Sequence, residues 1–230
     1  MLNRYLWAGE HQRLQQSIAN LARDGVEISD EVIVIQFISC WLNNQRTQLP
    51  ELSRLLGHRN SHRARCWQPV VAALATDTSS NEMLSAAAAV LQHYPQSPVL
   101  RYIHAMALQS LGDQDAAVLA YRVAIAMSPR WSTPRTALSR LQRDRGDFRL
   151  AFCEAVEAVR AAPHTDDALN ALILSAAKMH ADGEQLQIEV QQAILKTVQQ
   201  ARNQTTNVRS RQICLQRFRH SIMSLMWRID

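Results

Sequence analysis

The sequence predicts an all-α fold of antiparallel helix hairpins that repeat every 34 residues. First, Pro95, Pro129 and Pro163 stand 34 residues apart, and so do Gly112 and Gly146. Second, the apolar residues between these markers recur every three or four positions, as on one face of a helix. Third, only six Gly and seven Pro interrupt 230 residues, of which 47% are hydrophobic. This composition excludes a disordered or collagen-like chain and favours hairpins that stack on one another.

The unit 98–131 shows the parts of one hairpin most plainly. Its first helix is expected to end at Gly112, because glycine readily adopts the left-handed conformation of a helix C-cap. Asp113 can then cap the second helix, which stops before Pro129 because the residue before a proline avoids the helical region. The small side chain of Ala117 lets the two helices approach closely.

The period divides most of the chain into hairpin units. The predicted units are 30–63, 64–97, 98–131, 132–165 and 166–202. The match fades toward the N-terminus, where residues 1–29 are expected to form a helical cap. In the last unit we expect helices near 166–181 and 184–202, in a distorted hairpin, because Gly183 comes three residues late. Residues 203–230 are expected to cap the other end, and all of these parts are expected to form one continuous domain.

Small residues, glycine and proline recur at matching places in two units, and the first unit also has an aromatic residue, Tyr121. Unit 98–131 has Ala105, Gly112, Ala117, Tyr121, Ala124 and Pro129, and unit 132–165 has Gly146, Ala151, Ala158 and Pro163. Residues 98–165 thereby resemble the tetratricopeptide repeat family. The units depart from it at Arg101 and His104, where large apolar residues are usual, and at Ala155, where an aromatic one is usual. The resemblance implies a right-handed α-solenoid whose concave groove holds a peptide, a helix or another protein.

The resemblance also implies which residues line the groove, since the family presents certain positions of each first helix to the ligand. Those positions hold Tyr102, Met106, Gln109, Thr136, Arg140, Arg143, Asn170, Leu174 and Lys178. Tyr102 and Met106 occupy places where the family's carboxylate clamp needs a basic residue and Asn, so that clamp is not expected. A segment with an apolar anchor followed by acidic residues would fit better. Alternatively, Arg140 and Arg143 are solvated or pair locally with acidic residues.

Nothing in the sequence indicates catalysis or a bound metal. The commonest nucleotide-binding and hydrolase motifs do not occur, so we expect neither an enzyme nor a cofactor. His58 and His62 have a spacing that could bind a metal on a helix, but Gly57–Ser61 is typical of a loop, so no metal site is predicted. Trp67 and Trp131 are interpreted as packing residues.

The spacing of the cysteines and the lack of a recognised targeting segment bear on the compartment in which the protein is expected. The four cysteines are Cys40, Cys66, Cys153 and Cys214; they lie far apart in the sequence and are expected to be buried free thiols. No secretory signal or membrane span is recognised, which predicts a cytoplasmic protein. Residues 208–228 form a basic amphipathic pattern, interpreted as a capping helix. Self-association, or binding of a membrane surface or nucleic acid, stays open for that segment.

The most consistent function is a non-catalytic protein-interaction scaffold, such as a bacterial adaptor or chaperone. A regulatory or sensor module of a larger protein is the alternative. A nucleic-acid-binding protein is a weaker alternative, because it rests only on an isoelectric point of about 9.4. The salt dependence of binding would distinguish a nucleic-acid ligand from an apolar peptide ligand in the groove. Binding to phosphate weakens steeply as salt is added, and binding of an apolar segment does not.

Overall fold

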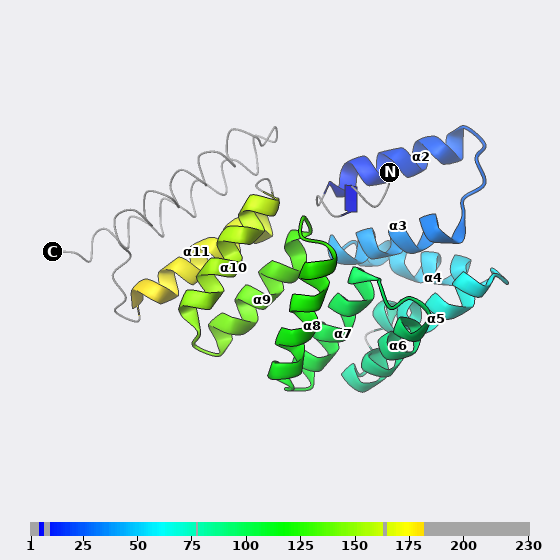
Figure 1. Cartoon of the computed structure of the whole chain (residues 1–230). Coiled ribbons are helices and arrows are strands. Elements are labelled where there is room, and N and C mark those ends of the chain that lie inside the picture. Colours follow the sequence, from blue (N-terminus) through cyan, green and yellow to red (C-terminus); the bar gives the residue numbers. More distant parts are fainter. Residues whose placement is uncertain (1–4, 7–9, 77, 163–164, 182–230) are drawn as a thin grey trace. The chain divides into compact units, whose positions relative to one another are not determined.

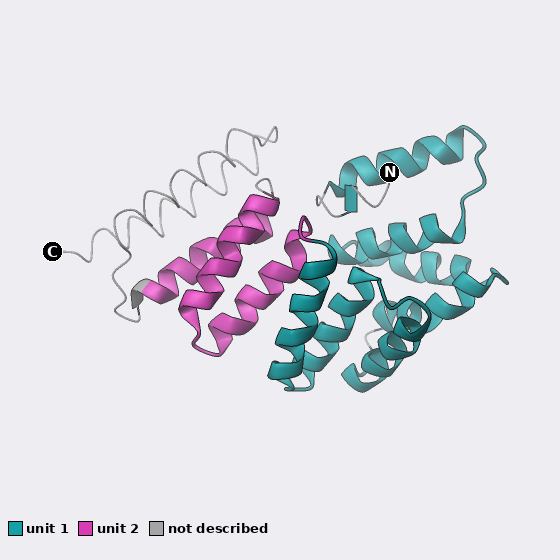
Figure 2. Ribbon diagram, viewed as in Figure 1, with its two compact units in different colours: residues 1–128 teal, residues 129–230 magenta. Residues whose placement is uncertain are grey.

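The computed structural model describes residues 5–6, 10–76, 78–162 and 165–181, and every regular element among them is helical (Figure 1). The predicted all-α class is confirmed for these residues. The chain divides into two compact units, Met1–Ser128 and Pro129–Asp230, which Figure 2 colours separately. Each unit is described by itself below. None of the described helices is long and apolar enough to cross a membrane.

Unit 1 holds the helices from α2 to α8. They are α2 (His11–Arg23), α3 (Asp30–Leu42), the short 3-10 helix η1 (Arg46–Gln48), α4 (Leu49–Gly57), α5 (His62–Ala75), α6 (Ser80–His93), α7 (Pro98–Ser110) and α8 (Gln114–Met127). Each α-helix packs against the next one along the chain, and α3 also packs against α5. Because α3 has neighbours on several sides, it is apolar around most of its circumference and buries residues from Ile33 to Cys40.

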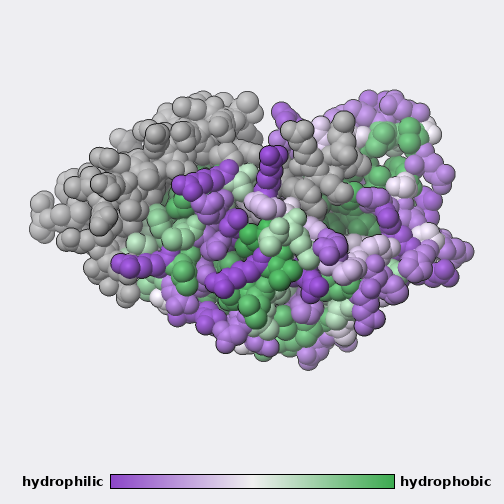
Figure 3. Space-filling model, viewed as in Figure 1, coloured by the Kyte–Doolittle hydropathy of each residue, from purple (hydrophilic) through white to green (hydrophobic). Residues whose placement is uncertain are grey.

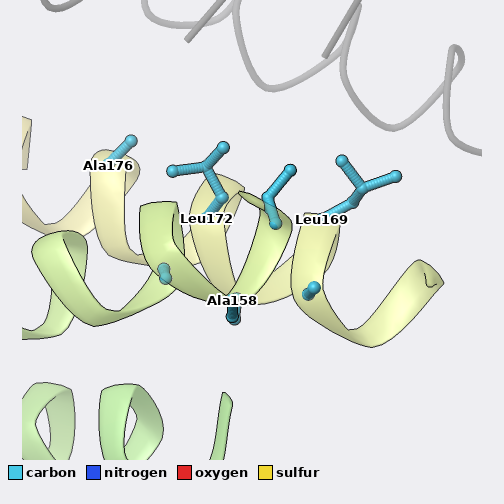
Figure 4. Packing of buried hydrophobic residues seen from close by; sticks show 8 residues of the cluster. Ala158, Leu169, Leu172 and Ala176 are labelled. Carbon is cyan, nitrogen blue, oxygen red and sulfur yellow. The ribbon is translucent and has the colours of Figure 1, made fainter. Parts of the chain in front are cut away.

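Unit 2 holds α9 (Ser132–Asp144), α10 (Phe148–Ala161) and α11 (Asp166–Ala181), each in contact with the other two. Its core cluster lies between α10 and α11 and is built mainly from alanine. The buried members are Ala155, Ala158, Val159, Ala168, Leu169, Ala171, Leu172 and Ala176. Figure 4 shows Ala158 on one helix and Leu169, Leu172 and Ala176 on the other. The small side chains allow the two helices to pack at short range.

From α6 onward the helix starts follow the 34-residue period, whereas α4 and α5 depart from it, α4 beginning at Leu49, 31 residues before α6. The starts of α3, α7, α9 and α11, at 30, 98, 132 and 166, are separated by whole multiples of 34. Helix α5 begins at His62, two residues earlier than the period predicts, because Ser61 Oγ accepts a hydrogen bond of 3.0 Å from the Ala64 amide and caps the helix there. Helix α11 occupies the predicted range 166–181.

The two predicted glycine turns are confirmed. Gly112 and Gly146 have φ of 85° and 84°, and each lies between the two helices of a hairpin. After α7, the Asp113 amide donates to the Leu108 carbonyl at 3.1 Å and the Gly112 amide donates to the Gln109 carbonyl at 3.1 Å. The same pair of bonds closes α9, so both turns are Schellman motifs that require a left-handed residue.

The small residues expected at the helix crossings are buried. Ala117 and Ala124 of α8 and Ala151 and Ala158 of α10 have no exposed surface. Tyr121 is also fully buried, and its hydroxyl donates to Gln109 Oε1 at 2.8 Å. These positions therefore fix how closely the two helices of each hairpin approach.

The expectation of buried thiols is only partly right. Cys40 is buried, and burial raises the pKa of its thiol against an opposing hydrogen bond from Gln15. Cys66 is half-buried and Cys153 is exposed, so the expectation is wrong for Cys153. Cys153 lies two positions from the buried Ala151 and Ala155, so the helical period places it off their inward face, on the outer side of α10. Cys214, the helix expected near 184–202 and the capping helix expected in 203–230 lie outside the described residues.

Candidate functional site

A cavity of about 210 Å³ opens in unit 1, where α3, α5 and the start of α7 come together. Its lining residues are Leu6, Glu31, Val34, Ile35, Ile38, Arg63, Trp67, Tyr94, Ser97, Pro98 and Val99. We call this cavity the unit 1 pocket. Its walls are mainly apolar side chains, and its polar side chains are few, which is the usual composition of a binding pocket.

Helix α3 forms the apolar floor of the unit 1 pocket. Val34, Ile35 and Ile38 are all buried, with 6%, 8% and 1% of their surface exposed. They follow one another at i, i+1 and i+4, so they lie on one side of α3. Because the opposite side of α3 is buried too, through Phe37 and Cys40, the floor is held in place from behind.

The wall near α6 and α7 is held by local contacts. The rings of Trp67 and Tyr94 have centroids 6.2 Å apart. The Ser97 amide donates to the Tyr94 carbonyl at 3.1 Å, and Ser97 Oγ caps α7 by accepting from the Leu100 amide at 3.4 Å. Pro98 follows in the first turn of the helix, where its fixed φ suits the backbone. The pocket is therefore formed before any ligand arrives.

One ion pair stands among the lining residues. Arg63 Nη1 and Glu31 Oε2 are 2.6 Å apart, and their side chains are 42% and 53% exposed. The hydrogen bond to Glu31 raises the pKa of the Arg63 guanidinium, and burial opposes it. An ion pair this exposed adds at most about 1 kcal/mol to stability. Its larger effect is to place one donor and one acceptor group beside an apolar cavity.

The groove residues expected on α7 lie apart from this pocket. Tyr102 is buried, with its ring centroid 6.0 Å from that of Trp41 and 5.9 Å from that of Tyr121. Gln109 accepts the Tyr121 hydroxyl bond, and Met106 is half-buried. Tyr102 and Gln109 therefore take part in helix packing. Most of the pocket lining comes instead from 30–97, where the repeat pattern is weakest, with Leu6 and the first residues of α7 completing it. The apolar run Ile33–Ile35 is the sequence signal that marks its floor.

The groove residues expected on α9 and α11 belong to unit 2. Arg140, Lys178 and Leu174 are exposed, the last at 51%. Thr136 and Asn170 are half-buried, and Thr136 Oγ1 donates to the Ser132 carbonyl at 3.1 Å. The two helices pack together, and Ser175, which Arg143 contacts, stands three residues before Lys178 on α11. We call Arg140, Arg143 and Lys178 the α9/α11 basic face.

Arg143 is the most constrained member of this basic face. It is half-buried, and Nη1 donates to Ser175 Oγ of α11 at 3.4 Å. Burial lowers the pKa of its guanidinium, Arg140 lowers it further, and Asp144 opposes both. Asp147 pairs instead with Arg145, with Oδ2 and Nε 3.6 Å apart. Arg143 thus bridges α9 and α11, while Arg140 is exposed.

No family model matches this chain, and no curated protein matches it either. The likeness to tetratricopeptide repeats therefore rests on the residues of the chain itself.

The structure also brings together a group of side chains from two stretches that are far apart in the sequence. His58 lies in the loop 58–61, as expected, but His62 is the first residue of α5. Among the described residues, His62, Cys66 and His93 form a group whose nitrogen and sulfur atoms lie within 4.8 Å of one another. Cys66 and His93 are 27 positions apart, so no motif spacing in the sequence points to them.

Hydrophobic residues are exposed elsewhere on the described surface. Figure 3 shows hydrophobic residues at the surface in the region of α8, and Leu119 and Val123 of that helix are 64% and 39% exposed. They are one turn apart on the outer side of α8. Both residues lie outside the lining of the unit 1 pocket, and this region of α8 serves below as a control site.

Proposed function

We propose that this chain is a non-catalytic interaction scaffold that binds a protein or peptide segment, with one apolar side chain of that segment in the unit 1 pocket. The observation that carries the proposal is the pocket itself. It is apolar, preformed and built from three consecutive first helices of the hairpins, α3, α5 and α7. In a tetratricopeptide-like solenoid these helices line the concave side, which supports the same reading.

The size of the pocket favours a side chain over a whole small molecule. Pockets for drug-sized ligands and cofactors usually measure about 300–1,000 Å³. The unit 1 pocket measures about 210 Å³, below that range. One large apolar side chain, such as leucine or phenylalanine, is a better match in volume. Anchors of this kind, buried in a preformed pocket, provide much of the energy of protein interfaces.

The polar groups of the pocket favour binding over catalysis. Glu31 and Arg63 neutralise each other, and Ser97 Oγ accepts a hydrogen bond from a helix amide. Arg63 also interacts with Tyr94, and the Ser97 hydroxyl caps a helix, so these groups make structural contacts rather than a nucleophile–base pair of the kind that covalent catalysis requires. The Glu31 and Arg63 side chains are placed instead to meet the backbone or polar side chains of a bound segment.

The α9/α11 basic face supports an acidic contribution from the partner. Arg140 and Lys178 are exposed, and an arginine guanidinium can pair with a carboxylate through two parallel hydrogen bonds. Within unit 2 this face would attract acidic residues of the partner and discriminate against basic segments. The proposed ligand therefore has an apolar anchor for the unit 1 pocket and acidic residues for the basic face of unit 2, and this chain would bind it as an adaptor or chaperone.

The proposal can be tested by selecting peptides from a random library on the whole chain and measuring their affinities by fluorescence anisotropy. The pocket is then filled by Ile35→Phe or Val99→Phe, each at a lining residue whose small exposed fraction faces solvent at the cavity. Leu119→Phe makes a similar change in size at an exposed position on α8 and is the matched control.

We expect the selected peptides to share a large apolar residue and to lose at least about 10-fold in affinity on each pocket variant. The control should bind them as the unchanged chain does. Circular dichroism confirms that each variant keeps its helices. Peptides that bind all three variants equally would show that the pocket is not the anchor site and would refute the proposal.

A further inference from the structure

The end of the α5/α6 hairpin carries a cluster of metal-binding side chains. His62 and Cys66 come from the first turns of α5, and His93 is the last residue of α6. Their nitrogen and sulfur atoms all lie within 4.8 Å of one another. Both histidines are exposed and Cys66 is half-buried, so an ion can reach them from solvent. The proposed function does not use any of the three residues.

The helix geometry explains why these side chains meet. His62 and Cys66 are four residues apart, so they lie on the same face of α5. A short connection, residues 76–79, joins α5 to α6, and the two helices pack together. The last turn of α6 therefore lies beside the first turn of α5, and His93 reaches the face that carries the other two residues.

Both helix ends are held in place by neighbouring contacts. Ser61 caps α5 through the Ala64 amide and also hydrogen bonds to Asp30 Oδ2. After α6, the Tyr94 amide donates to the Val90 carbonyl at 2.9 Å, and the Tyr94 ring packs on Trp67. A ligand set on two anchored helix ends loses little conformational freedom when it binds an ion.

The distances suit a tetrahedral ion after small side-chain rotations. Cys66 Sγ is 3.7 Å from each ring nitrogen of His62. The rings of His62 and His93 have centroids 5.5 Å apart and are nearly perpendicular, at 82°. With Zn–N of about 2.0–2.1 Å and Zn–S of about 2.3 Å, tetrahedral ligands lie roughly 3.3–3.6 Å apart. Exposed histidine side chains can close the remaining gap by rotation about χ1 and χ2.

We propose that His62, Cys66 and His93 bind one Zn²⁺ ion, with the fourth coordination position left to water. A thiolate with two imidazoles is a borderline-soft ligand set, which favours Zn²⁺ over Mg²⁺ or Ca²⁺ because those ions prefer oxygen ligands. The bound ion would link the start of α5 to the end of α6. Both helix ends also contribute residues to the unit 1 pocket, Arg63 and Tyr94, which directly follow two of the ligands.

Co²⁺ titration of the whole reduced chain is the direct test, because cobalt takes the place of zinc and reports its ligands by absorption. We expect one equivalent of Co²⁺ to give visible bands of tetrahedral cobalt and a thiolate-to-cobalt charge-transfer band. One equivalent of Zn²⁺ should then displace it. Octahedral cobalt spectra, or no thiolate band, would overturn the proposal.

Single substitutions assign the ligands. His62→Ala, Cys66→Ser and His93→Ala should each lower Zn²⁺ affinity at least about 100-fold, more than the loss of an outer-shell partner costs. His58→Ala and Cys153→Ser remove the same residue types at exposed positions outside the cluster and should leave the affinity unchanged. A thiolate band that survives Cys66→Ser, or that Cys153→Ser abolishes, would show that the proposed site is wrong.

A second measurement needs no variant. Alkylation of the unchanged chain, followed by peptide mapping, gives the reaction rate of each thiol. Zn²⁺ should slow the reaction of Cys66 and leave that of the exposed Cys153 unchanged. Equal rates for Cys66 with and without Zn²⁺ would refute the site even if a variant had failed to fold.

Discussion

Replacing Gly112 with alanine should destabilise the protein by an amount that the structure allows us to work out. Its φ of 85° lies in the left-handed region, which costs a residue with a Cβ about 1–2 kcal/mol. An added Cβ would meet no heavy atom within 4 Å, so no steric clash adds to this cost. Alanine also lowers the conformational entropy of the unfolded chain, which stabilises the folded protein by about 0.4–1 kcal/mol. The expected net loss is about 0–1.6 kcal/mol.

Gly57→Ala is the matched control, because Gly57 ends α4 without a left-handed φ. Its new Cβ would lie 3.3 Å from Gln68 Nε2, the far end of a flexible side chain that can move aside. Here the restriction of the unfolded chain should prevail, so that the variant is unchanged or more stable by up to about 1 kcal/mol.

Urea unfolding followed by circular dichroism measures both changes. Gly112→Asn should lose less than Gly112→Ala, since asparagine tolerates the left-handed region. The Gly112→Ala and Gly146→Ala losses should add to within about 0.5 kcal/mol, because the two turns belong to different units. If Gly112→Ala were as stable as the unchanged chain while Gly57→Ala lost stability, the assignment of the turns would be wrong.

Three further predictions concern packing, pH and charge. Ala117→Leu should cost about 1–3 kcal/mol, because Ala117 has no exposed surface and a larger side chain overpacks the crossing of α7 and α8; an unchanged melting curve would contradict this. Burial, aided by Arg101, lowers the pKa of His104 below its ordinary value of 6.5. Folding therefore favours its neutral form, and stability should fall as pH drops through 6.5 toward the lower folded-state pKa. His104→Gln should make unfolding free energy less dependent on pH in that range, and an equal slope would exclude His104 as the cause. The double variant Arg140→Glu, Arg143→Glu should bind the selected acidic peptides more weakly and keep its helicity. Undiminished affinity would show that the α9/α11 basic face does not contribute to peptide binding.

Most of the helix ends and turns could be predicted from single residues and their spacing. Gly112 and Gly146 mark turns because each turn requires one residue with a left-handed φ, which glycine adopts readily. Prolines likewise mark helix ends through the conformation of single residues. The start of α5 departed from the period because the cap at Ser61, a side-chain hydrogen bond, outweighed the repeat register. Such a local contact shifts a helix by a turn or less, so the hairpins themselves were still recognisable.

The sites were harder to predict, because they depend on packing between residues far apart in sequence. The unit 1 pocket combines α3, α5 and the start of α7, and buried Tyr102 packs against Tyr121 and against Trp41, which lies 61 positions away in the sequence. The group around His62 arises only when the end of α6 is placed beside the start of α5. The helical period predicts on which side of its helix a residue lies, but it does not predict which other helix packs against that side.

The alanine-rich contact between α10 and α11 constrains how this sequence can diverge. Alanine has no rotamers to lose on burial, so the contact forms at a low cost in side-chain entropy. The contact also has no space for a larger side chain, since any such side chain at Ala155 or Ala158 would push the two helices apart. Related chains should therefore keep small residues at these buried positions while their exposed positions on the same helices vary freely. Such a pattern of retained alanines would identify relatives even where overall sequence identity has faded.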